Sequence, residues 1–145
     1  MQSGKREEGE NRMTQTDTKG SFQNILTISK LPPDALVHEL ISRYSVTIPE
    51  QINNADDLKE AGKLLGRLAN IKTFLYSLLS YLKVAARQEK AKGRDFRDEA
   101  ERLAMDRDAV ELMLDAVKGQ YDAVSRMLTA HKMELDELKM LGLTG

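Results

Sequence analysis

The fold of this chain is decided by the stretch from Phe96 to Leu138, FRDEAERLAMDRDAVELMLDAVKGQYDAVSRMLTAHKMELDEL. Apolar residues recur along it at alternating spacings of four and three, a period of about 3.5 residues that is typical of a coiled coil. Only Arg107 and His131 interrupt the row, and polar residues at such positions usually fix the register or the oligomeric state. The row therefore predicts a long helix that buries this stripe against another helix.

A second long helix is predicted upstream of this stretch. Its apolar residues form two overlapping rows at four-three spacing, which share Leu68, Leu75 and Leu82. We expect this helix over residues 55–92 and the later one over 95–141, because Gly93 follows a lysine-rich stretch as a helix C-cap does. A sharp break at Gly93 gives an antiparallel hairpin, whereas a mere kink leaves one continuous rod that dimerises.

These patterns predict an all-α fold, a long antiparallel helical hairpin or coiled coil that associates with itself. Two adjacent apolar rows on one helix would leave apolar surface exposed in a lone hairpin, so we expect a homo-oligomer. Alanines at seven-residue intervals from Ala109 to Ala130 indicate a further helix interface. The predicted oligomer seam consists of Leu68, Leu75, Leu82, Val110, Leu114, Val117, Tyr121, Val124 and Leu128.

The chain before the hairpin is expected to be less regular. Residues 1–21 are polar with balanced charge, and we predict a disordered tail there. Residues 22–54 are predicted to contain an apolar patch, a short helix that Pro32 and Pro33 open, and a connector. Asn53 or Asn54 can cap the first long helix, and the hairpin region then takes residues 55–145.

Composition narrows the classes of function. Charged residues make up 31% of the 145, yet the net charge is −1, so the chain as a whole predicts neither nucleic-acid nor membrane binding. The absence of cysteine excludes disulfides, a thiolate nucleophile and cysteine-ligated zinc, and it fits a reducing cytoplasm. The most apolar window, residues 71–82, is too short to cross a membrane.

No motif in the chain points to catalysis. Gly62 and Gly66 flank a segment that lacks the spacing and context of a phosphate-binding loop, and we interpret them as allowing close helix packing. The carboxylates Asp106 and Asp108, like Glu99 and Glu101, alternate with arginines, which indicates a solvated helix face. We therefore expect no catalytic residue, no metal, no cofactor and no enzymatic activity.

One local cluster of positive charge, between residues 83 and 94, points to a function. In a monomer it is a solvated loop, but an oligomer gathers one cluster per subunit, and gathered cations bind a polyanion by neutralising several phosphates together. Arg97 and Arg102 continue the cluster, and Tyr76 and Tyr81 are either stacking surfaces or core residues. The predicted DNA-binding residues are Lys83, Arg87, Lys90, Lys92 and Arg94.

The layout from residue 55 to residue 141 carries a family resemblance. A long helix ends in the basic segment Leu82-Lys83-Val84-Ala85-Ala86-Arg87-Gln88-Glu89-Lys90, and after a break a heptad helix includes Leu103-Ala104-Met105-Asp106-Arg107-Asp108. This layout resembles the UvsY-type recombination mediators of tailed phages. The chain departs from that family in having Ala91-Lys92-Gly93-Arg94-Asp95 where an aromatic-rich continuation is expected.

The resemblance implies an accessory protein of phage-type DNA recombination or replication, in the cytoplasm of a bacterial host. Such a protein forms an oligomer, binds single-stranded DNA, and helps to load a RecA-class recombinase in the presence of a single-strand binding protein. The alternative is a helical scaffold or assembly chaperone that binds a protein partner through its heptad seams.

Overall fold

The computed structural model describes residues 21–142, with side chains from Gln23 onward. Its elements in chain order are α2 (Ser21–Ile28), α3 (Pro33–Tyr44), α4 (Ala55–Ala91), the short 3₁₀ helix η2 (Arg94–Phe96) and α5 (Arg97–Met140). No strand occurs among these residues, which confirms the all-α prediction. The predicted disordered tail lies outside the described residues, except for Ser21, which begins α2.

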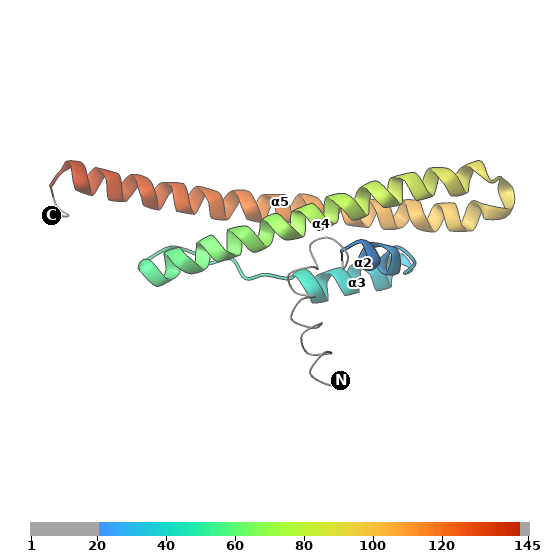
Figure 1. Ribbon diagram of the computed structural model, residues 1–145, viewed down its shortest axis with the longest axis horizontal. Coiled ribbons are helices and arrows are strands. Elements are labelled where there is room, and N and C mark those ends of the chain that lie inside the picture. The colour runs from blue at the N-terminus through green and yellow to red at the C-terminus, as the bar shows by residue number, and fades with distance from the viewer. Residues whose placement is uncertain (1–20, 143–145) are drawn as a thin grey trace, which may run out of the picture.

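The two long helices form an antiparallel hairpin rather than one rod (Figure 1). The chain reverses at Gly93, whose φ of 107° is a conformation that residues with a Cβ atom rarely adopt. The tight turn of η2 follows at once, so α5 begins at Arg97, two residues later than the sequence predicts. The reversal thus takes only Lys92, Gly93 and η2.

The core of the hairpin lies along the contact between α4 and α5. From α4 it takes residues of both overlapping rows, and from α5 it takes the apolar residues of the heptad row between Leu103 and Leu128. Phe96, Leu135 and Leu138, at the two ends of that row, are exposed. All nine predicted seam residues are buried or half-buried here, within a single chain. Their role in a contact between chains stays a prediction, because one chain already covers them.

Side-chain capping sets the start of α4. The Oδ1 atom of Asn54 accepts a hydrogen bond from the backbone N–H of Asp57 at 2.8 Å. The carboxylate of Asp57 in turn accepts one from the backbone N–H of Asn53 at 3.0 Å. This reciprocal pair satisfies donors that the first helical turn leaves free, and Asp57 also complements the helix dipole.

The short helices α2 and α3 lie together on one side of the hairpin (Figure 1). α2 packs on α4 and α3 packs on α5, with Ile28, Leu36 and Leu40 almost fully buried. The second apolar row of α4 therefore has a neighbour within the same chain. For this reason, the two rows alone do not require a second chain.

Gly62 and Gly66 do not serve helix packing, contrary to the sequence interpretation. Both are exposed in the interior of α4, and a Cβ atom added at either would meet nothing within 4 Å. Ala116, Ala123 and Ala130 on α5 are likewise exposed, so the described residues provide no partner for that face. Among residues 21–142, no helix has both the length and the apolar character needed to span a membrane.

Candidate nucleic-acid interface

A basic hollow lies between α4 and α5 at the closed end of the hairpin. It has a volume of about 680 Å³ and is open to solvent. Five of its ten lining residues are cationic and one is a carboxylate, Glu101. The remaining four are alanines and a glycine, which leave room for a ligand between the charged side chains. The cationic lining residues are Arg87, Lys90, Arg94, Arg97 and Arg107.

Three of the five predicted DNA-binding residues line this hollow. Arg87, Lys90 and Arg94 are exposed, and none of them has a carboxylate partner within residues 21–142. Lys83 is also exposed and lies one helical turn before Arg87 on the same face of α4. None of these four residues forms an ion pair with a carboxylate among the described residues.

Lys92 belongs to a different part of the turn. Its Nζ atom lies 2.8 Å from a carboxylate oxygen of Glu89 and 5.3 Å from the ring centroid of Phe96. Lys92 does not line the hollow. Its position on the neighbouring face follows from helix geometry, since residues two apart on a helix do not face the same way.

Two arginines of α5 complete the hollow. Arg97 pairs with Glu101 at 3.1 Å, and Arg107 pairs with Asp108 at 3.1 Å, so each carries a nearby compensating charge. The sequence places Arg97 in the basic cluster, whereas Arg107 interrupts the heptad row and gives no sign of a role in the cluster. The role of Arg107 depends on the register of the hairpin, which places Arg107 opposite Arg87 and which the sequence alone does not reveal.

Arg102 does not belong to the basic hollow, and its assignment to the cluster is wrong. Its guanidinium donates hydrogen bonds to the backbone carbonyls of Ser29 and Leu31, at 3.0 and 2.7 Å. It also donates to Asp106 at 2.8 Å and forms an ion pair with Glu99. Arg102 therefore fastens the end of α2 to α5 on the covered side of the hairpin.

Asp106 is fully buried, which corrects its assignment to a solvated face. Its Oδ2 atom accepts the hydrogen bond from Arg102, while its Oδ1 atom has no partner among the described residues. Burial raises the pKa of Asp106 to about 6, although the positive charge of Arg102 opposes this. The hydrogen bond from Arg102 lowers the pKa of Glu99. Both carboxyl groups serve the joint between α2 and α5.

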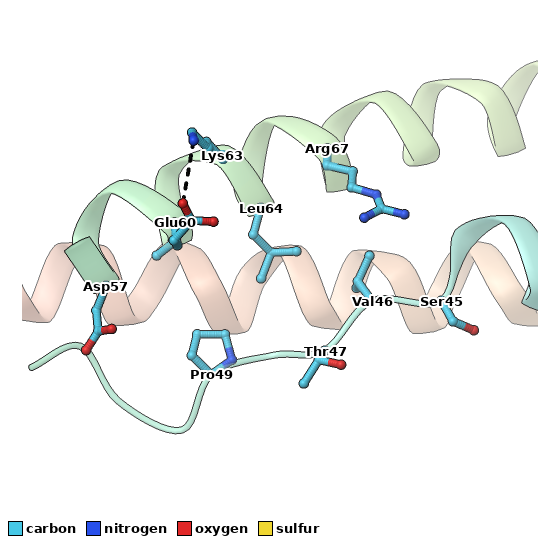
Figure 2. A pocket seen from close by; sticks show the side chains of 10 residues that line it. Ser45, Val46, Thr47, Pro49, Asp57, Glu60, Lys63, Leu64 and Arg67 are labelled. Atoms are coloured by element: carbon cyan, nitrogen blue, oxygen red, sulfur yellow. Dashed lines mark hydrogen bonds and ion pairs between the residues drawn. The ribbon is translucent and has the colours of Figure 1, made fainter.

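A second hollow lies between α4 and the connector that follows α3 (Figure 2). Leu64 points from α4 toward the connector, between Val46 and Pro49. The acidic residues of this hollow already have partners, because Asp57 caps the helix and Glu60 lies 3.5 Å from Lys63. The hollow thus has mixed, mutually compensated lining groups and no concentration of one charge.

Metal binding has no candidate site in the part of the chain that the structure describes. Residues 23–142 contain no cluster of three histidine or carboxylate side chains that could hold a metal ion. The one strongly perturbed carboxyl group, Asp106, is buried in a structural joint rather than in a hollow. The uncompensated cations of the basic hollow are therefore the strongest chemical feature described. Comparison with protein-family models, curated proteins and solved structures finds no match to this chain.

Proposed function

We propose that this protein is a non-enzymatic accessory factor of phage-type DNA recombination or replication that binds single-stranded DNA through the basic hollow. The observation that carries the proposal is the row of Lys83, Arg87, Lys90 and Arg94, which has no carboxylate partner within residues 21–142. Unpaired cations at fixed spacing release counterions from a phosphate backbone, which is the main source of sequence-independent affinity.

The recombinase-loading part of the proposal rests on the resemblance of residues 55–141 to UvsY-type mediators. In that role the protein acts in the cytoplasm of a bacterial host, beside a RecA-class recombinase and a single-strand binding protein. Its own chemistry is limited to holding the strand, since charge and shape rather than reactive groups make up the hollow.

We also propose that the protein works as a homo-oligomer, joined at the end of α5. The last turns of this helix extend beyond the start of α4 in Figure 1. They expose five large apolar side chains, and Met140 is 88% exposed. A helix end that is apolar on several sides favours burial against another helix. The exposed apolar residues are Met133, Leu135, Leu138, Met140 and Leu141.

Charge favours a parallel arrangement of two such helix ends. Leu135 and Leu138 continue the heptad row, with Glu134 before them and Lys139 after them. In a parallel pair, Glu134 of one chain faces Lys139 of the other, whereas an antiparallel pair sets like charges against each other. Parallel pairing also places both basic hollows at the same end of the assembly, where one strand can contact both.

The alternative function, a scaffold or assembly chaperone, is favoured by a different surface. Met105 and Leu112 are 59% and 73% exposed on the outer face of α5, beside the exposed alanines Ala116 and Ala123. A partner protein with a complementary apolar helix would fit this face. Only the DNA-binding function requires the basic hollow, so one experiment separates the two functions.

That experiment measures binding of a fluorescent, unstructured oligonucleotide across a salt series. The three unpaired cations that line the hollow, Arg87, Lys90 and Arg94, predict a slope of log K against log salt of about −2, or roughly −4 if two chains contact the strand. The variant Arg87→Glu with Lys90→Glu should abolish binding while leaving helicity and oligomeric state unchanged, because both side chains are exposed.

The matched control is Lys59→Glu with Lys63→Glu, which makes the same change in charge at the other end of α4. We expect it to bind nearly as the wild type does, because neither residue lines the basic hollow. Absence of binding by the wild type at low salt would favour the assembly function. Equal loss in both variants would show that overall charge, and not this hollow, determines binding.

A further inference from the structure

Two lysine–tyrosine pairs join α4 and α5 along the same face as the basic hollow. The Nζ atom of Lys118 lies 4.7 Å from the ring centroid of Tyr76, and that of Lys72 lies 4.6 Å from the ring centroid of Tyr121. Each helix thus supplies one lysine and one tyrosine. The hydrogen bond from Lys118 to Tyr76 also raises the pKa of the lysine.

Heptad spacing places these pairs in line with the hollow. On α5, Lys118 and Tyr121 follow the lining residues Ala104 and Arg107 by two heptads. On α4, Lys72 and Tyr76 precede the lining residues Ala86 and Lys90 by the same interval. Residues two heptads apart lie on the same side of a paired helix. The hollow and both pairs therefore share one face.

This face is opposite to the joint that holds the short helices. Arg102, which also donates to Asp106, binds the backbone carbonyls of Ser29 and Leu31 at the end of α2 on the other flank of α5. Neither α2 nor α3 supplies a lining residue to the basic hollow. This face, which the short helices among the described residues leave uncovered, runs from Arg97 to Tyr121, a helical rise of about 36 Å.

We propose that this uncovered face is a path for a single strand, with phosphates at the basic hollow and unpaired bases stacked on Tyr76 and Tyr121. The inference rests on the proposed function and adds the residues that hold the bases of the strand. A positively charged groove together with aromatic rings is the arrangement by which proteins hold single strands without reading sequence.

The lysines of the two pairs have a part in this path. Tyr76 is 43% exposed, so one side of its ring is open to solvent. A lysine over an exposed ring is held only weakly, and it moves readily to a phosphate when a base takes its place. Duplex DNA keeps its bases stacked on each other, so it can use the hollow but not the rings.

The test compares two strands of equal length, an oligo-dT and an abasic strand with the same phosphates. The wild type should bind oligo-dT at least tenfold more tightly than the abasic strand, because each stacked base contributes about that much. Tyr76→Leu with Tyr121→Leu should remove this preference and leave both the affinity for the abasic strand and the salt slope unchanged. Leucine keeps the apolar contact that Tyr121 makes with the core.

Tyr81→Leu is the matched control, because Tyr81 lies seven residues after Phe74, on the side of α4 that faces α3. It should bind both strands as the wild type does. Equal binding of the two strands by the wild type would overturn the stacking path and leave the proposed function standing. Failure to bind either strand would overturn both. A loss with Tyr81→Leu equal to that of the double variant would place the stacking elsewhere.

Discussion

Replacing Asp106 by asparagine should remove a pH dependence of stability that the buried carboxyl group creates. Asp106 is fully buried, and one of its two carboxylate oxygens has no hydrogen-bond partner among the described residues. Burial is the largest influence on its pKa, which rises from 3.8 to about 6. Arg102 opposes this rise, and Glu99 adds to it. The ionised form is therefore disfavoured in the folded protein.

The sign of the effect follows from where the proton is held. Between pH 3.8 and about 6, the folded protein keeps a proton that the unfolded chain has released. The free energy of unfolding therefore falls as the pH rises through this window, and it changes no further above the folded pKa. A difference of about two pKa units corresponds to at most about 3 kcal/mol.

The assay is urea unfolding followed by circular dichroism at several pH values. Asparagine is close to aspartate in shape and stays neutral, so the free energy of unfolding of Asp106→Asn minus that of the wild type isolates this one group. We expect the difference to rise by about 3 kcal/mol at most from pH 4 to pH 7. Asp122→Asn removes an exposed carboxylate from the same helix and reports the effect of an amide alone. A difference that stays flat, or falls, over this range would refute the reasoning.

Further predictions concern the hairpin and its association. Gly93→Ala should lower stability by about 1–3 kcal/mol, because the φ of Gly93 is 107°. Gly66→Ala, in an open helical position, should instead raise stability by roughly 0.5–1 kcal/mol. Changes of the same sign in the free energy of unfolding of these two variants, measured with urea, would contradict the structure. Val117→Asp buries a charge in the core and should cost several kcal/mol, whereas the exposed neighbour Ala116→Asp should leave helicity nearly unchanged. Leu138→Cys should give a covalent dimer on oxidation, since only a parallel pair brings residue 138 against itself. Ser80→Cys, at an exposed position on α4, should give none. A monomer by light scattering would count against the oligomer.

Local signals in the sequence predict α3 and the two long helices, whereas α2 is expected only as an apolar patch. The proline pair before Asp34, the capping asparagine at position 54 and the glycine at position 93 each set a helix boundary through chemistry that acts within a few residues. The side of each helix that meets a neighbour also follows from the four-three spacing. These features need no knowledge of what lies opposite.

The composition of the site depends on contacts between distant residues, and there the sequence is less informative. Arg102 is a neighbour of the basic cluster in sequence, but it turns to the carbonyls of Ser29 and Leu31, some 70 residues earlier. Arg107 interrupts the apolar row, yet it reaches solvent at the hollow once α4 lies opposite. The burial of Asp106 likewise follows from the docking of α2 and α3, which no periodicity of α5 predicts.

The nearly neutral net charge of the chain conceals a separation of charge between faces. Exposed carboxylates recur at heptad intervals on the outer flank of α5, at Asp115, Asp122 and Asp136. The uncompensated cations Arg87, Lys90 and Arg94 lie in the hollow at the closed end of the hairpin. At physiological salt the field of a surface charge is screened within about 8 Å, so these acids repel a phosphate bound in the hollow only weakly. Attraction therefore acts at contact rather than at long range, and mutations of the hollow should change the dissociation rate of a bound strand more than its association rate.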